Sequence, residues 1–128
     1  MTKASKNVVL LIADSMVRKG LELLITGMEL NVVSCDSESE VKKKLAENQI
    51  TPDLLIFPLL LTADKPSIYL VRQLRQQYKD SIPTIILTND TPMHELLITD
   101  SNIIVLPDDV KPSTLRERIS ESIACPMN

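Results

Sequence analysis

Residues 8–15 read VVLLIADS, a continuous apolar run that ends in a short polar turn. Four further apolar runs follow along the chain, at residues 31–33, 54–57, 84–87 and 103–106. These runs do not alternate between apolar and polar residues, so we expect strands that are covered on both faces. A segment with helical periodicity follows each run. The chain is therefore predicted to repeat a strand–helix unit five times.

The predicted helices are recognised by apolar residues at intervals of three and four, which places them on one face. A capping box at residues 37–40 begins the second helix, and prolines at positions 66, 92 and 112 lie at the starts of the third, fourth and fifth. The residues expected to face inward are, helix by helix, Val17, Leu21, Leu24, Ile25 and Met28; Val41 and Leu45; Leu70, Val71, Leu74 and Tyr78; Met93, Leu96 and Leu97; and Leu115, Ile119 and Ile123.

The order of these elements predicts the fold class. Strand–helix–strand connections of this length require parallel strands joined by right-handed crossovers. The class is therefore α/β, an open parallel sheet with helices on both faces. Ligands of such sheets bind beyond the carboxyl ends of the strands. The positions to inspect are thus residues 13–15, 58–61, 88–90 and 106–109.

The composition excludes several classes of function. Gly20 and Gly27 are the only glycines among 128 residues, too few for a phosphate-binding glycine loop. One histidine, His94, and two distant cysteines, Cys35 and Cys125, do not supply a zinc site or a Ser-His-Asp triad. A net charge of −3 and only three aromatic residues argue against direct binding of nucleic acid.

The amino terminus predicts the cellular compartment. Residues 1–6 are short and polar, and the first apolar run is far briefer than the roughly 20 residues of a membrane span. We therefore expect a cytoplasmic protein that makes no contact with a membrane and keeps its cysteines as free thiols. Residues 1–128 are expected to form a single domain, with a core from about 7 to 124.

In this order and spacing, the motifs resemble those of the receiver domain of two-component response regulators. They are the turn IADS at residues 12–15 followed by Arg18, the strand PDLLIF at 52–57, IPTIILT at 82–88, and LP at 106–107 ahead of the last helix. The resemblance covers nearly all of residues 7–123. It implies a flavodoxin-like, CheY-like (βα)5 fold, a doubly wound three-layer α/β/α sandwich whose five strands run in the order 2-1-3-4-5.

The resemblance also locates a phosphorylation site, and this chain departs from its pattern. Receivers carry a phospho-accepting aspartate after the third strand, an acidic pair that holds Mg²⁺ after the first, a hydroxyl residue after the fourth and a lysine after the fifth. Carried over, these positions fall on Pro58, on Ala13 and Asp14, on Thr88 and on Leu106. Only Thr88 keeps its identity outright. Counted back from the last helix instead, the lysine position falls on residues 108–109, which are both aspartates.

These departures predict a degenerate pseudo-receiver in bacterial two-component or phosphorelay signalling. It has no catalytic residue and no cofactor, because proline offers no carboxylate and Asp14 alone binds Mg²⁺ weakly at most. We expect it to act by contact with a protein partner or with a second copy of itself. In receivers the usual contact face is formed by the fourth helix, fifth strand and fifth helix. Here that face would include Met93, Leu96, Leu97 and Leu106.

Several alternatives stay open on the sequence alone. The domain is an active receiver if Asp64, or another loop carboxylate, accepts phosphate; Asp53 begins its strand at the far edge of the sheet. It is a small-ligand sensor if the crevice left by Ala13, Pro58 and Leu106 takes a ligand. Asp14 is interpreted first as a helix cap. The three leucines at residues 59–61 either continue the third strand and pack into the emptied site, or form an exposed apolar patch for a partner.

Overall fold

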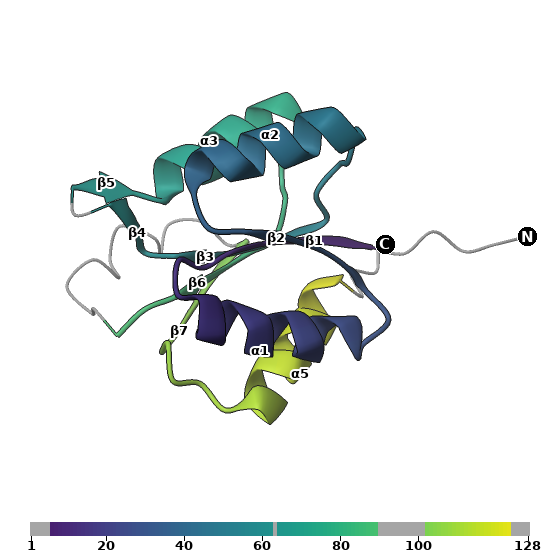
Figure 1. Cartoon of the computed structure of the whole chain (residues 1–128), viewed down its shortest axis with the longest axis vertical. Coiled ribbons are helices and arrows are strands. Elements are labelled where there is room, and N and C mark those ends of the chain that lie inside the picture. The colour runs from purple at the N-terminus through teal and green to yellow at the C-terminus, as the bar shows by residue number, and fades with distance from the viewer. Residues whose placement is uncertain (1–5, 63, 90–101, 124–128) are drawn as a thin grey trace, which may run out of the picture.

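The computed structural model describes residues 6–62, 64–89 and 102–123, and within them it is a three-layer α/β/α structure (Figure 1). Five parallel strands form the central sheet in the order β2-β1-β3-β6-β7. Helices α1 and α5 cover one face, and α2 and α3 cover the other (Figure 1). The bounds of the sheet strands are β1 Asn7–Leu11, β2 Asn31–Cys35, β3 Leu54–Pro58, β6 Thr84–Leu87 and β7 Ile103–Leu106.

The four described helices follow these strands. Their bounds are α1 Ser15–Thr26, α2 Glu38–Asn48, α3 Ile68–Gln77 and α5 Pro112–Ile123. The fourth helix predicted from the sequence, with Met93, Leu96 and Leu97, lies outside the described residues. No helix in the described part of the chain is long and apolar enough to cross a membrane.

The strand order differs from the predicted 2-1-3-4-5 because the prediction missed a two-stranded hairpin. Strands β4, Leu60–Thr62, and β5, Lys65–Pro66, pair antiparallel between β3 and α3. The fourth and fifth strands of the parallel sheet are therefore β6 and β7. The hairpin is too short to carry a periodicity of its own, and this explains why the periodicity analysis did not predict it.

Two apolar cores fill the spaces between the sheet and its helices. Alternate residues of one strand point to opposite faces, so Val9 and Leu11 enter one core while Val8 and Leu10 enter the other. The first, here named the α2/α3 core, includes Phe57, Val41, Leu45, Leu70, Val71 and Leu74. The second, named the α1/α5 core, includes Ile25, Leu54, Ile56, Leu87, Leu106, Leu115 and Ile119.

The first turn of α1 differs from its predicted burial. The apolar stripe placed Val17 inward, but 49% of its surface is exposed, and its neighbour Met16 is 84% exposed. Both residues lie just beyond the carboxyl end of β1, at the edge of the sheet. The apolar periodicity indicates which residues share a face of the helix, but it does not indicate where the sheet that this face packs against ends. Ile25, two turns further on, is fully buried as predicted.

Ser67 is a buried polar residue without a described partner. It lies directly before α3, is 1% exposed, and its hydroxyl makes no hydrogen bond. A buried hydroxyl that gives up its bonds to water costs about 1–3 kcal/mol. The residue therefore lowers the stability of the junction between the hairpin and α3.

We predict that Ser67→Ala raises the free energy of unfolding by about 1 kcal/mol, because it removes an unpaired buried hydroxyl and little volume. Urea unfolding measures the change. Thr84→Val is the matched control, since the Thr84 hydroxyl is equally buried but donates to the carbonyl of Ile82 at 3.2 Å. That variant should lose stability. A loss for Ser67→Ala of the same size as for Thr84→Val would contradict the prediction.

Cys35, at the end of β2, provides a second prediction, on pH. Burial raises the pKa of its thiol from 9.0 to about 11. Between these values the unfolded chain releases the proton while the folded chain keeps it, so stability falls as pH rises through this window. The full loss is at most about 3 kcal/mol. Urea unfolding at pH 8 and near pH 11 should show a smaller loss for Cys35→Ala than for the wild type. Equal losses would show that Cys35 does not titrate in this window.

Candidate functional site

The carboxyl ends of the central strands bring the predicted site residues together. Pro58, the last residue of β3, lies opposite Leu87 of β6, and Leu87 lies opposite Leu106 of β7. Just beyond them, the amide of Thr88 donates to the carbonyl of Leu106 at 2.9 Å. Asp14 follows β1 and lines the same groove as Pro58. The sequence analysis thus correctly predicted that these residues meet at the carboxyl ends of the strands.

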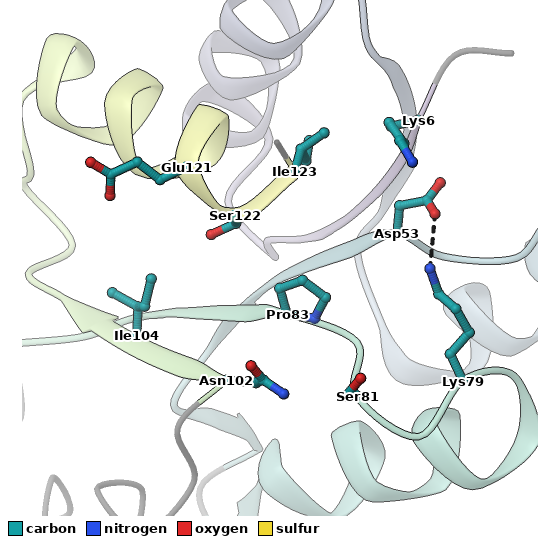
Figure 2. A pocket seen from close by; sticks show the side chains of 10 residues that line it. All are labelled: Lys6, Asp53, Lys79, Ser81, Pro83, Asn102, Ile104, Glu121, Ser122 and Ile123. Atoms are coloured by element: carbon teal, nitrogen blue, oxygen red, sulfur yellow. Dashed lines mark hydrogen bonds and ion pairs between the residues drawn. The ribbon is translucent and has the colours of Figure 1, made fainter. Parts of the chain in front are cut away.

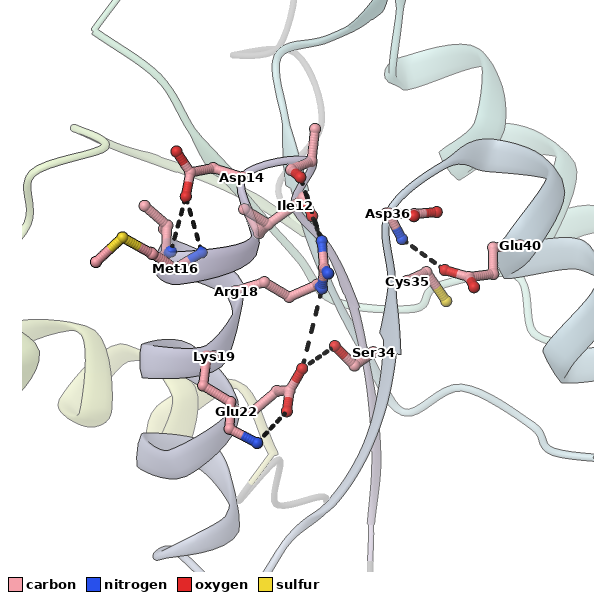
Figure 3. A network of polar contacts seen from close by, with 12 residues as sticks. Ile12, Asp14, Met16, Arg18, Lys19, Glu22, Ser34, Cys35, Asp36 and Glu40 are labelled. Carbon is pink, nitrogen blue, oxygen red and sulfur yellow. Dashed lines mark hydrogen bonds and ion pairs between the residues drawn. The ribbon is translucent and has the colours of Figure 1, made fainter.

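Asp14 is the N-cap of α1. Its Oδ1 atom accepts hydrogen bonds from the amides of Met16 at 2.9 Å and Val17 at 3.1 Å (Figure 3). These amides belong to the first turn, which has no helical partner for them, and a carboxylate there also interacts favourably with the helix dipole. The interpretation of Asp14 as a cap is confirmed.

Arg18 also stabilises the turn between β1 and α1. Its Nη1 atom donates to the carbonyl of Ile12 at 2.7 Å and to that of Ala13 at 3.3 Å (Figure 3). Its Nε lies 4.0 Å from the carboxylate of Glu22, which in turn accepts a hydrogen bond from the hydroxyl of Ser34. The sequence singled out Arg18 as part of a motif but did not predict this role. Two carbonyl oxygens of the turn are therefore already engaged by the chain's own guanidinium.

The three leucines after Pro58 do not continue β3: Leu59 lies in a bend, and Leu60 and Leu61 begin the separate strand β4. Leu59 is buried and Leu61 packs against the α2/α3 core, while Leu60, between them, is 37% exposed. The carbonyl of Leu59 accepts a hydrogen bond from the amide of Ser67 at 2.9 Å, which closes the hairpin. The leucines thus contribute to the core beneath α2 and α3 and do not fill the space at the strand ends.

The alternative acceptor Asp64 lies in the hairpin turn. It is exposed, and its Oδ1 accepts a hydrogen bond from the hydroxyl of Thr62 at 3.3 Å. The next residue, Lys65, donates to Glu38 at 2.6 Å and so ties the hairpin to α2. This hydrogen bond lowers the pKa of Glu38. Asp64 is not among the residues that line the strand-end groove.

Asp53 lies at the opposite edge of the sheet, as predicted. Its carboxylate accepts from the amide of Asn7 at 2.8 Å and from the ammonium of Lys79 at 3.0 Å. It borders a cavity of about 460 Å³ between the start of β3 and the end of α5 (Figure 2). Both carboxylate oxygens are engaged in structural contacts. This makes Asp53 a residue of the fold and separates it from the strand-end site.

Asn89 and Asp108 form a contact that the sequence did not reveal. The side-chain amide of Asn89 donates to Asp108 Oδ1 at 2.5 Å, and the backbone amide of Asp108 donates to Asn89 Oδ1 at 3.3 Å. This reciprocal pair joins the loop after β6 to the loop after β7. The two residues are 19 positions apart, so no local spacing indicates the contact.

The donor set at this edge does not fit Mg²⁺. That ion requires near-octahedral coordination by oxygen atoms, usually from carboxylates and waters. Ala13 and Pro58 provide no side-chain oxygen, and Asp14 uses Oδ1 to cap α1. Within the described residues, no three His, Cys, Asp or Glu side chains are grouped to hold a metal ion.

A groove of about 650 Å³ occupies the strand ends on the side of α1 and α5. It lies between the first turns of α1, the ends of β3 and β6, and the segment that leads into α5. Its walls are apolar apart from two carboxylates. The lining residues are Ile12, Asp14, Met16, Val17, Gly20, Leu21, Leu24, Pro58, Leu87, Asp108, Val110, Pro112 and Leu115. Neither Ala13 nor Leu106, two positions of the predicted crevice, lines it.

No protein-family model matches the sequence, and no curated protein matches it. Solved structures do match the fold. A candidate response regulator from Chloroflexus aurantiacus J-10-fl is 22% identical with a TM-score of 0.78, and the match covers 95% of this chain and 100% of that chain. A CheY-like receiver domain protein from Methanospirillum hungatei JF-1 is 15% identical with a TM-score of 0.79, covering 94% and 95%.

A third structure is the receiver domain of a sensor histidine kinase from Pseudomonas aeruginosa PAO1, which holds a magnesium ion in its active-site cleft. It is 14% identical with a TM-score of 0.75, and the match covers 95% of this chain and 100% of that chain. Receiver domains therefore recur among the structural neighbours, and the α/β class with five parallel strands is confirmed. The chain has the α/β fold of response-regulator receiver domains.

Proposed function

We propose that this chain is a pseudo-receiver, a bacterial, cytoplasmic signalling domain of the two-component type that acts by protein contact and without phosphorylation. The observation that carries the proposal is Pro58 at the carboxyl end of β3. The receiver resemblance places the phospho-accepting carboxylate at this position. A proline side chain has neither a nucleophilic oxygen nor an exchangeable proton, so an acyl phosphate cannot form on it.

The surroundings of Pro58 support the same function. The adjacent Leu59 is buried in the α2/α3 core, so its side chain is committed to packing. Asp14 caps a helix, and Asp108 pairs with Asn89. These two strand-end carboxylates thus have structural roles within the chain. A domain built this way needs no catalytic residue and no metal cofactor.

The proposed partner is a protein, either a different chain or a second copy. Of the predicted contact face, Met93, Leu96 and Leu97 lie outside the described residues. Leu106 belongs to the α1/α5 core and is only 8% exposed, so we withdraw it from the face. The described part of the face comprises β7 and the outer side of α5, where Arg118 and Glu121 form an exposed ion pair at 3.3 Å.

We predict that millimolar Mg²⁺, followed by beryllofluoride as a mimic of aspartyl phosphate, leaves the NMR amide signals of Asp14, Leu59 and Thr88 unshifted. The physical reason is the missing acceptor carboxylate and the incomplete set of metal ligands. Isotope-labelled protein is titrated with each reagent in turn, and the three amides report on the ends of β1, β3 and β6.

Asp64→Asn is the matched control for this titration, since it removes the alternative acceptor and leaves Pro58 and Asp14 in place. Saturable shifts in the wild type that disappear in Asp64→Asn would contradict the proposed function and establish an active receiver with a displaced acceptor. Saturable shifts that persist in Asp64→Asn would contradict it as well, and would direct the search to another loop carboxylate.

The role of Asp14 provides a separate prediction. Asp14→Ala should lower the free energy of unfolding by about 1 kcal/mol, whereas Asp14→Asn should stay within a few tenths, because asparagine also caps helices. Urea unfolding is measured with and without millimolar Mg²⁺. If Asp14 were a metal ligand, Mg²⁺ would stabilise the wild type but not Asp14→Asn. We expect no such difference.

A further inference from the structure

The strand-end groove has the size and chemistry of a small-molecule site. Its volume of about 650 Å³ falls within the range of known ligand pockets, about 300–1,000 Å³. Of the thirteen described residues that line it, eleven are apolar or glycine, and the other two are Asp14 and Asp108. An occupant must therefore bring an apolar body, and any charged group it carries must be positive.

Gly20 keeps this groove open at a cost to the helix. It lies inside α1, and a Cβ atom built on it meets nothing within 4 Å. Its φ is not positive, so the backbone there does not require glycine. A glycine inside a helix is less favourable than alanine by about 0.5–1 kcal/mol. The space above Gly20 belongs to the groove, which a larger side chain would fill.

The neighbours of Gly20 form an apolar track along α1. Val17, Leu21 and Leu24 lie on the same side of the helix and line the groove with it. Val17 is half exposed, so it remains available for contact. Leu115 closes the groove from α5. An alkyl chain or ring that lies along this track would remove apolar surface of both the ligand and the protein from water.

The charge at the mouth of the groove selects the sign of the ligand. Asp14 uses Oδ1 for both of its cap bonds, which leaves Oδ2 outside the cap. Asp108 is exposed and accepts from the neutral amide of Asn89, so its charge is not paired there. Among the described residues that line the groove there is no lysine or arginine. Two carboxylates thus face the same space, and the described walls offer no cation.

We propose that the groove binds a small cationic amphiphile, with its apolar part along Val17, Gly20 and Leu24 and its amine at Asp14 and Asp108. Ligand binding at this groove does not depend on whether the domain is phosphorylated. Binding would give this domain a ligand-responsive surface formed jointly by α1 and the segment leading into α5.

An NMR titration with octylammonium, below its micelle concentration, tests the proposal. We expect saturable shifts at the amides of Val17, Gly20 and Leu115. Octanoate and octanol have the same chain with a negative or a neutral head. Octylammonium should bind about fivefold more tightly than octanoate, the preference expected from two partly exposed carboxylates. Equal affinity for octylammonium and octanoate would overturn the proposal, and so would the absence of saturable binding.

Two variants separate the site from unspecific adhesion to apolar surface. Gly20→Leu fills the groove and should weaken octylammonium binding at least tenfold. Thr26→Leu adds the same side chain to an exposed position of α1 outside the groove and should bind like the wild type. If Gly20→Leu binds like Thr26→Leu, the groove is not the site. Gly20→Ala, which should raise helix stability, shows whether position 20 tolerates a side chain.

The double variant Asp14→Asn/Asp108→Asn tests the charge without changing the groove. Asparagine keeps the cap of α1 and keeps an acceptor for Asn89. Octylammonium should lose its advantage over octanoate, while octanol binding stays unchanged. A double variant that keeps the full preference for the cation would overturn the assignment of the two carboxylates.

Discussion

Burial of both faces of β3 is the constraint on which the rest of the structure depends. Leu54 and Ile56 enter the α1/α5 core, and Leu55 and Phe57 enter the α2/α3 core, so consecutive residues of one strand join two separate cores. Each fully buried side chain of this size contributes about 1.5–3 kcal/mol. A strand held from both sides cannot slip in register without moving apolar groups into the wrong layer. The strand therefore fixes where β1 and β6 end beside it, and with them the position of the strand-end groove.

The proline at position 58 and the apolar loop after it fit the same packing arrangement. Proline lacks an amide hydrogen and is tolerated at the end of a strand, where the next ladder bond is no longer needed. The chain then continues into β4, and Leu59 and Leu61 extend the α2/α3 core beyond the edge of the sheet. Residues that would be polar in a phosphate-binding loop are thus used for stability. Residues 58–61 are all apolar, and this explains why no carboxylate from this stretch lines the groove.

How much the sequence predicted depends on whether the signal is local. The five strands of the parallel sheet were predicted from continuous apolar runs, and helices α1, α2, α3 and α5 from apolar residues that repeat every three or four positions. The exposure of Val17 was not predicted, because it depends on where the neighbouring layer of the fold ends. The β4–β5 hairpin was missed because three consecutive leucines show no alternation, although Leu60 points away from its neighbours in the structure. The pairing of Asn89 with Asp108 joins the loops after the neighbouring strands β6 and β7, and no local spacing in the sequence indicates it. The cap formed by Asp14 is entirely local, and it was predicted.

The loops at the site are stabilised by contacts within the chain, and this bears on how the domain can signal. Asp14 and Arg18 satisfy backbone groups of the turn after β1, and Asn89 with Asp108 joins the loops after β6 and β7. In a site that responds to an added phosphate, loop groups are free to reorganise around the new charge. Here the same groups already have partners within the chain, so a newly bound anion would have to break those contacts. A neutral or cationic ligand would not have to break these contacts. It could enter the groove while the Asp14 cap, the contacts of the Arg18 guanidinium and the Asn89–Asp108 pair stay intact. In the function proposed for this domain, recognition therefore uses a preformed surface and needs no switch driven by phosphate.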